Sequence, residues 1–308
     1  MSSWTAGDIP DQTGRTALVT GANSGLGFAT SAALAGKGAR VLMACRSPER
    51  AEAALERLRT RVPGAAVELV ALDLASLASV HQAADDAAAR TARLDLLVCN
   101  AGVMAVPRGH TADGFETQLG TNHLGHFALT GRLLPLLLAA PAPRVVVVSS
   151  GAHRAGRIAF DDLMGERSYG RWKAYGQSKL ANLLFVRELA HRATAAGLPL
   201  VAAAAHPGYA ATGLQSGQGA RLLERLMQVG NAVLAQSAEA GALPSLYAAT
   251  APDVRSGDYY GPSLAELRGA PKKVGRSAAA RDDAVARQLW QESERLTGVT
   301  YDALPAPA

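Results

Sequence analysis

The stretch Thr16-Ala-Leu-Val-Thr-Gly-Ala-Asn-Ser-Gly-Leu-Gly27 decides the fold of this chain. It opens with an apolar run typical of a buried strand, and helical sequence follows its last glycine at once. Gly21, Gly25 and Gly27 allow a tight turn, a close backbone approach and close packing of the following helix. Free amides at the start of that helix attract phosphate. A Gly-rich turn alone is a weak signal, but between a strand and a helix it predicts nucleotide binding.

The alternation of strands and helices continues along the chain. We predict further strands at 40–44, 67–71, 94–98, 144–148 and 198–204, and a short one at 257–260. Most are continuous apolar runs, as in strands covered by helices on both faces. We predict helices at 25–37, 48–61, 76–92, 112–139 with a break near 121, 173–196, 220–235, 238–250 and 282–296. Right-handed crossovers then give an α/β Rossmann-type fold, a doubly wound parallel sheet of about seven strands.

The chain of 308 residues shows no repeat and no linker-like shift in composition. We therefore predict a single domain over 1–308, with its core at about 13–260 and a C-terminal tail, 261–308, that carries one helix. With 48% apolar and 19% charged residues, a disordered chain is excluded. The net charge of +5 comes from scattered basic residues, which argues against a nucleic-acid partner.

Targeting and redox signals are weak. The N-terminus has no signal-peptide pattern, and no apolar run approaches the ~20 residues of a transmembrane helix. The two cysteines, Cys45 and Cys99, cannot build a disulfide framework and match no zinc spacing. We therefore expect a reduced, cytoplasmic protein with no metal site and no transmembrane segment.

Arg46 ends the second predicted strand, 19 positions after Gly27. In dinucleotide-binding folds an acidic residue near this place binds the adenosine ribose, whereas an arginine accommodates a 2′-phosphate. No Asp or Glu occupies 41–47. The sequence therefore favours NADP(H) over NAD(H), because a guanidinium binds phosphate through charge-assisted hydrogen bonds. The alternative is a solvated arginine at a strand end.

Short polar or small residues follow the next two strands, at Asp73-Leu74 and Asn100-Ala101-Gly102. The ends of adjacent parallel strands line the binding crevice of this fold. Each segment alone is ordinary loop composition, but their repetition at successive strand ends fits an adenine and a ribose.

The candidate chemistry follows the fifth strand. Ser150 lies at its end, and Tyr175 and Lys179 lie one turn apart on a predicted helix. A free phenol has a pKa of ~10, and a neighbouring cation would lower it by roughly one to three units. Tyr-x-x-x-Lys is common by chance, so the argument needs Ser150 and the Gly-rich turn beside it.

Together these residues resemble the short-chain dehydrogenase/reductase family over about residues 13 to 260. The motifs that carry the resemblance are Thr20-Gly-x-x-x-Gly-x-Gly27, Asn100-Ala-Gly102, Asn122, Ser150, Tyr175-x-x-x-Lys179 and His206-Pro-Gly208 with Thr212. The family commonly has an asparagine where this chain has Cys99.

The resemblance implies a role for each catalytic residue. Tyr175 would be the general acid/base, and Ser150 would hold the substrate oxygen. Lys179 would bind the nicotinamide ribose and lower the Tyr175 pKa, while Asn122 would support a water relay to Lys179. The implied cofactor-binding residues are Gly21, Asn23, Ser24, Gly25, Leu26, Gly27, Arg46, Asp73, Leu74, Asn100, Ala101, Gly102, Tyr175, Lys179, Pro207, Gly208 and Thr212.

A narrower resemblance lies in Ala44-Cys-Arg46, in Asn122-His-Leu-Gly-His-Phe127 and in the 25 positions between Ser150 and Tyr175. These features resemble the retinol dehydrogenase and protochlorophyllide reductase-like branch, whose members mostly prefer NADP(H). We therefore expect an NADP(H)-dependent oxidoreductase that interconverts an alcohol and a carbonyl on a hydrophobic small molecule. The alternative is a catalytically silent NADP(H)-binding regulator on the same fold. A homo-oligomer is compatible with the sequence.

For several other side chains a structural role is at least as plausible an interpretation as a functional one. His123 and His126 could suggest a metal pair, but packing is the favoured interpretation, and His206 is expected to set backbone geometry. His81, His110, His153 and His191 are expected at the surface or in loops, and Asp161-Asp162 in a solvated turn or cap. Aromatic and apolar residues between Ser150 and Tyr175 fit a substrate wall or ordinary loop packing equally well: Phe160, Leu163, Tyr169 and Trp172.

Overall fold

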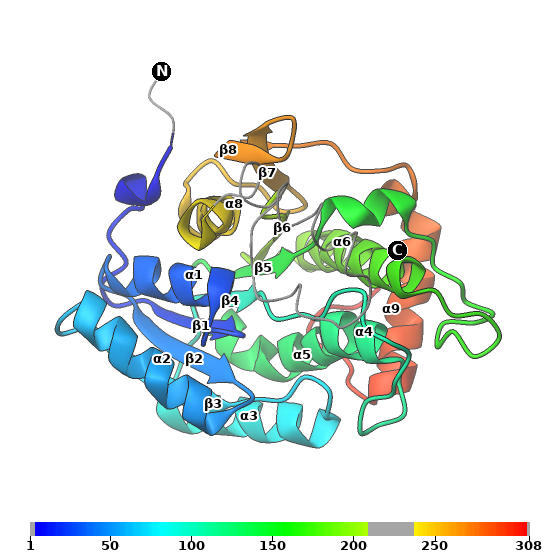
Figure 1. The fold of residues 1–308 in the computed structure, drawn as a ribbon, viewed down its shortest axis with the longest axis horizontal. Helices are drawn as coiled ribbons and strands as arrows, with labels where there is room; N and C mark the ends of the chain where they lie inside the picture. Colours follow the sequence, from blue (N-terminus) through cyan, green and yellow to red (C-terminus); the bar gives the residue numbers. More distant parts are fainter. Residues whose placement is uncertain (1–3, 209–236, 307–308) are drawn as a thin grey trace, which may run out of the picture.

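The computed structural model describes residues 4–208 and 237–306 and contains one eight-stranded sheet. The strand order is β3-β2-β1-β4-β5-β6-β7-β8 (Figure 1). The first seven strands run parallel, and β8 is antiparallel to β7. Their bounds are β1 Thr16–Thr20, β2 Arg40–Cys45, β3 Val67–Ala71, β4 Leu96–Cys99, β5 Arg144–Val148, β6 Val201–Ala205, β7 Tyr259–Leu264 and β8 Arg268–Lys273. The predicted Rossmann-type α/β sheet is thus confirmed.

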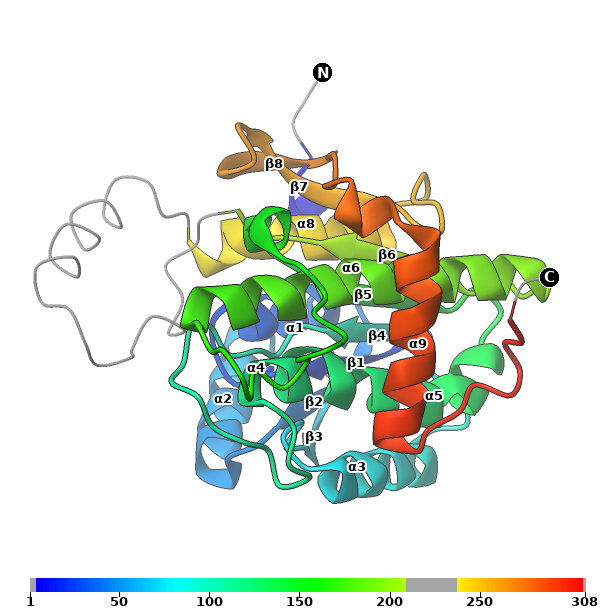
Figure 2. The same cartoon turned by 90° about the vertical axis from the view of Figure 1, so that its right-hand side faces the viewer.

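Helices cover both faces of the sheet, and each face has its own hydrophobic core. One face is covered by α1 (Gly25–Ala35), α2 (Pro48–Arg61) and α8 (Ala238–Thr250) (Figure 1). The other carries α3 (Leu77–Arg90), α5 (Gly125–Leu138) and α6 (Arg171–Ala195), with α9 (Asp283–Thr297) packed against α6 (Figure 2). This two-sided burial is why strands β1, β4 and β5 are almost uniformly apolar.

The C-terminal helix α9 docks through an aromatic cluster. Trp290 lies 5.1 Å from Phe127 and 5.8 Å from Phe185, measured between ring centroids. The Tyr301 hydroxyl donates a 2.6 Å hydrogen bond to the Phe127 carbonyl. Asp282 caps the helix by accepting from the amides of Ala284 and Val285. Helix α9 and the residues that follow it are therefore packed onto α5 and α6.

The sheet has eight strands, so the expected count of about seven is wrong. The extra strand, β8, lies in the segment for which the sequence predicted only one helix. Its sequence, Arg268-Gly-Ala-Pro-Lys-Lys273, contains no β-branched or aromatic residue, so periodicity gave no signal. It forms because the turn at Ala265 and Glu266, both with positive φ, folds it back onto β7.

The predicted break near 121 marks a change of helix type. After the single turn α4 (Thr117–Leu119), the π-helical turn η2 (Gly120–Leu124) leads into α5. π-Helical turns are uncommon and are frequent at functional sites. The predicted helix 220–235 lies outside the described residues. Within those residues, no helix is both long and apolar enough to cross a membrane.

Candidate active site

The Gly-rich turn has the close contacts that its sequence predicted. Gly21 adopts a φ of +66° and Gly25 a φ of +52°, conformations that favour glycine. A Cβ added at Gly27 would lie 2.3 Å from the Gly21 carbonyl oxygen. The turn ends in Ser24, which makes no side-chain cap on α1, so the first amides of this helix remain available to a ligand.

Thr20, directly before the turn, joins the ends of β1 and β4. Its hydroxyl accepts from the amides of Asn100 and Ala101, each at 2.9 Å. The Asn100 side-chain amide in turn donates to the Thr20 carbonyl at 2.8 Å. These bonds bring Asn100 and Ala101 beside the Gly-rich turn. A Cβ on Gly21 would lie only 3.1 Å from the Ala101 Cα.

The end of β2 is fastened to the same turn. The Gly21 amide donates to the Ala44 carbonyl at 2.8 Å, and the Cys45 sulfur accepts from the amides of Ala22 and Asn23. Burial raises the pKa of the Cys45 thiol to about 11. Arg46 follows at once and is exposed. Within the described ranges, no hydrogen bond or ion pair occupies its guanidinium.

Sequence analysis did not identify a second arginine that lies at the turn. Arg57 of α2 donates to the Asn23 carbonyl at 3.1 Å, and its guanidinium lies 4.6 Å from the Phe28 ring centroid. Arg57 lies far along α2, and the sequence shows no spacing rule that would connect it to Asn23. The Arg57 guanidinium therefore lies at the Gly-rich turn, and Arg46 follows the residue whose sulfur is bonded to that turn.

The residues that follow β3 and β4 differ in their distance from the predicted catalytic groups. Asp73 accepts from the Ala75 amide at 3.0 Å, and the Leu74 carbonyl packs where a Cβ on Gly125 would lie 2.4 Å away. Gly102 lies nearer the chemistry. A Cβ at this position would be 3.0 Å from the Asn122 side-chain oxygen and 3.5 Å from the Lys179 nitrogen. The strand-end residues thus extend from the Gly-rich turn to the predicted catalytic groups.

Ser150 and Tyr175 are brought together by a close approach of two segments. Ser150 begins the 3-10 helix η3 (Gly151–Ala155), where its hydroxyl accepts from the Ala152 amide at 3.2 Å. A Cβ on Gly156 would lie 2.3 Å from the Gly176 carbonyl, so only glycine permits this contact with α6. As a result the Ser150 side chain hydrogen-bonds to the Tyr175 phenol.

Lys179 lies buried beneath Tyr175. Its ammonium donates to the Val148 carbonyl at 3.1 Å and lies 5.7 Å from the Tyr175 ring centroid. Asn122 is also buried, and its amide nitrogen donates to the Val103 carbonyl and to the Ser178 hydroxyl, each at 2.9 Å. The four predicted catalytic residues therefore converge at the carboxyl ends of β4 and β5.

The electrostatics of the pair differ from the expectation. Burial raises the pKa of the Tyr175 phenol, and the hydrogen bond from Ser150 offsets only part of this effect. Burial also lowers the pKa of the Lys179 ammonium to about 8. The pKa of the Tyr175 phenol is therefore raised and not lowered as predicted, because loss of hydration is the largest influence on it. Near pH 7 the phenol keeps its proton.

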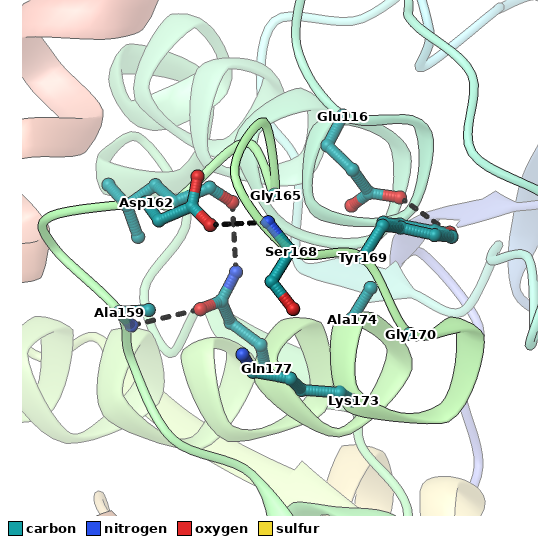
Figure 3. A pocket seen from close by; sticks show the side chains of 11 residues that line it. Glu116, Ala159, Asp162, Gly165, Ser168, Tyr169, Gly170, Lys173, Ala174 and Gln177 are labelled. Carbon is teal, nitrogen blue, oxygen red and sulfur yellow. Dashed lines mark hydrogen bonds between the residues drawn. The ribbon is translucent and has the colours of Figure 1, made fainter.

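Two cavities lie near these residues. The smaller one, shown in Figure 3, has a volume of about 20 Å³, enough for roughly one water. Leu163 and Tyr169 line it, and Gln177 bonds the Ala159 amide and the Leu163 carbonyl, so this segment packs as an ordinary loop on α6. The larger cavity, of about 630 Å³, has Ser150, His206 and Leu267 among its lining residues and is large enough for a small-molecule substrate.

The histidines have varied environments. His153 is buried, not at the surface as expected, because its Nδ1 lies 2.7 Å from the Ser150 carbonyl oxygen and its ring packs on Tyr259. The Gly208 amide donates to His206 Nδ1 at 3.2 Å, as a backbone-setting role requires. His123 and His126 are buried and bond different partners.

The last predicted positions follow β6 in the chain or lie at the end of β4. Gly208 has a φ of +68°, and a Cβ there would lie 2.3 Å from the Leu267 carbonyl oxygen. Pro207, just before it, is partly buried. Thr212 lies outside the described residues. Cys99, at the position of the usual asparagine, points into the core, where its sulfur lies 3.8 Å from the Thr130 hydroxyl.

Comparison with known proteins decides the family. A family model described as short chain dehydrogenase matches residues 15–223. This chain belongs to the short-chain dehydrogenase family. Mouse retinol dehydrogenase 14 is 43% identical over 299 residues, covering 93% of this chain and 86% of that protein. Human retinol dehydrogenase 13 is 41% identical, covering 93% and 84%. The predicted family and its retinol dehydrogenase-like branch are confirmed.

Solved structures of similar proteins agree with this family assignment. An uncharacterised protein from Mycobacterium paratuberculosis has a TM-score of 0.82 and 44% identity, covering 97% of this chain and 99% of that chain. RhlG from Pseudomonas aeruginosa, solved as an NADP complex, has a TM-score of 0.64 and 25% identity, covering 80% and 94%. As a short-chain dehydrogenase, the chain is an oxidoreductase that binds a nicotinamide cofactor and a small-molecule alcohol or carbonyl substrate.

Proposed function

We propose that this protein is an NADP(H)-dependent carbonyl reductase and alcohol dehydrogenase for hydrophobic small molecules. The observation that carries the proposal is the convergence of Ser150, Tyr175 and Lys179 beside a cavity of about 630 Å³. Asn122 lies next to Lys179, since a Cβ on Gly102 would contact the side chains of both. Binding alone would not require this set of groups, whereas carbonyl reduction uses each of them.

The residues present fit a dinucleotide. The uncapped start of α1 and the glycines before it would hold the pyrophosphate. Arg46 and Arg57 supply positive charge at the outer side of that turn, where a 2′-phosphate would be favoured and a carboxylate is absent from 41–47. Lys179 and the strand-end residue Gly102 would face the nicotinamide ribose.

The protein residues then perform the proton chemistry. When bound, the reduced nicotinamide supplies a hydride to the substrate carbon. Tyr175 donates its phenolic proton to the carbonyl oxygen, while the Ser150 hydroxyl hydrogen-bonds that oxygen as negative charge develops. Lys179 places positive charge beneath the phenol. The raised Tyr175 pKa keeps the phenol protonated near neutral pH, as its role as the acid in carbonyl reduction requires.

Exposed apolar side chains support a hydrophobic substrate. Trp172 is 61% exposed, and its ring lies 6.1 Å from that of Tyr175. Leu267 is also exposed and lines the larger cavity. Such side chains next to a catalytic group favour the binding of an apolar molecule.

The test is NADPH oxidation across aromatic, retinoid, steroid and polyketide-like carbonyls, with NADH assayed in parallel. We expect turnover of at least one apolar class, faster with NADPH than with NADH. A Ser150→Ala preparation, purified identically, controls for contaminating reductases. If NADPH binds but every carbonyl class fails, the reductase proposal is wrong and a binding role replaces it.

A further inference from the structure

A buried chain of hydrogen bonds joins the cofactor turn to the catalytic segment through one ring. His126 Nδ1 lies 3.0 Å from the Asn122 carbonyl oxygen, and His126 Nε2 lies 2.9 Å from the Thr20 hydroxyl. That hydroxyl also accepts the amides of Asn100 and Ala101. Thr20 and His126 are 106 positions apart in the sequence, so the fold alone creates this contact.

The partners of the ring fix its tautomer. The Asn122 carbonyl can only accept, so Nδ1 must carry a hydrogen. Burial lowers the pKa of His126 to about 4, so the ring is neutral near pH 7 and Nε2 carries no hydrogen. The Thr20 hydroxyl therefore donates its single hydrogen to Nε2 at 2.9 Å; the Val98 carbonyl, at 3.4 Å, is farther away. Each polar atom of the ring has one defined partner.

The other end of Asn122 is held as firmly. Its side-chain oxygen accepts from the Val103 amide at 2.8 Å, and its amide nitrogen bonds Val103 and Ser178. His126, in the first turn of α5, supplies the contact to the Asn122 main chain, which lies in the π-helical turn. The neutral ring suits this place for a second reason, because a charged one would repel the nearby Lys179 ammonium.

We propose that His126 is a positioning residue, whose ring sets the main chain of Asn122 relative to the cofactor turn at Thr20. The proposal rests on the proposed reductase function of the same site. Of the common side chains, a neutral imidazole can donate from one edge and accept at the other while remaining rigid. Phenylalanine would fill the space and make neither bond.

Two variants separate the two bonds. Asparagine carries its amide N–H at about the reach of Nδ1, so His126→Asn keeps a donor for Asn122 and loses the acceptor for Thr20. Glutamine reaches about as far as Nε2, so His126→Gln keeps an acceptor for Thr20 and loses the donor for Asn122. The measurements are kcat and KM for carbonyl reduction, the NADPH dissociation constant from fluorescence titration, and Tm.

The two variants should fail in opposite ways. We expect kcat of His126→Gln to fall roughly tenfold below that of His126→Asn, the scale of one lost buried hydrogen bond. We expect His126→Asn to bind NADPH about fivefold more weakly than His126→Gln. The control is His123→Gln, which alters a buried histidine that bonds Ser293 of α9 and should change kcat by less than about threefold while lowering Tm.

Equal losses of kcat and NADPH affinity in the two His126 variants would overturn the proposal. The NADPH titration needs no turnover, so it tests the hydrogen bond between Thr20 and His126 even if the reductase function proves wrong. The nitrogen NMR shifts of the unmodified protein give a third readout, which needs no variant to fold. A His126 ring protonated at Nδ1 alone supports the proposal, and a ring protonated at Nε2 refutes it.

Discussion

The two ends of this active site are built on different principles. At the cofactor end, the turn from Gly21 to Gly27 works through its backbone, and the decisive feature is the absence of a Cβ where Gly27 meets Gly21. At the catalytic end, Tyr175 and Lys179 work through side chains whose pKa values burial has shifted. If the proposed roles are correct, close backbone contacts determine cofactor binding, whereas loss of hydration determines the protonation of the proposed catalytic groups. Substitutions should separate these two properties.

The largest expected effect lies at the catalytic end. Tyr175→Phe removes the only proposed proton donor but keeps the ring, so kcat should fall by at least about 10³-fold. The NADPH dissociation constant should stay within about threefold, since the turn is untouched. Single-turnover kinetics and NADPH titration on one preparation check both values. Appreciable residual turnover would contradict the assignment of Tyr175.

The cofactor end can be tested by charge. Arg46→Asp places a carboxylate where a 2′-phosphate would bind, so the NADPH/NADH ratio of kcat/KM should fall by about 10²-fold. The matched control is Arg59→Asp, which changes the same charge on α2 at a residue paired with Glu56. A ratio that moves equally in both variants would indicate general electrostatics and not a specific site.

The same end can be tested by shape. Gly27→Ala would place a Cβ 2.3 Å from the Gly21 carbonyl oxygen and 2.6 Å from the Asn100 amide nitrogen. NADPH affinity should fall by about 30-fold, because the turn must shift. Gly275→Ala, at a glycine with open space around it, is the control and should bind normally. If both variants bind equally well, the turn is more adaptable than its contacts indicate.

The last effect concerns acid stability, and it is the smallest when taken per histidine and per pH unit. Burial lowers the pKa of His123 to about 3, and those of His126 and His206 to about 4. In the unfolded chain these histidines take up protons near pH 6.5, whereas in the native state they stay neutral until the pH is near 4 or lower. The free energy of unfolding therefore decreases as the pH falls from about 6.5 towards 4. Each histidine contributes roughly 1.4 kcal/mol per pH unit in this window.

Denaturant unfolding at pH 7, 6 and 5 measures this loss. His123→Phe removes one of the three groups, so its free energy of unfolding should fall with pH less steeply than that of the unmodified chain. Parallel curves for the two proteins would show that His123 does not titrate on unfolding in this range.

The sequence predicted what local patterns encode. The Gly-rich turn, the buried parallel strands and the Tyr175–Lys179 spacing depend on neighbours within a few residues, so they could be read directly. The sequence did not connect Arg57 or His126 with the Gly-rich turn, because each reaches it through a contact between distant segments. The Tyr175 pKa was predicted in the wrong direction, because burial of the phenol is a property of the whole fold.

The composition of β8 has a consequence for the free protein. This strand ends the sheet, and its Pro271, Lys272 and Lys273 are poor partners for a further strand. Proline offers no amide hydrogen, and the Lys272 and Lys273 side chains place charge at this edge, where Lys273 forms an ion pair with Asp258. Among the described residues, the composition that gives β8 no strand signal in the sequence therefore also disfavours edge-to-edge pairing at this end of the sheet.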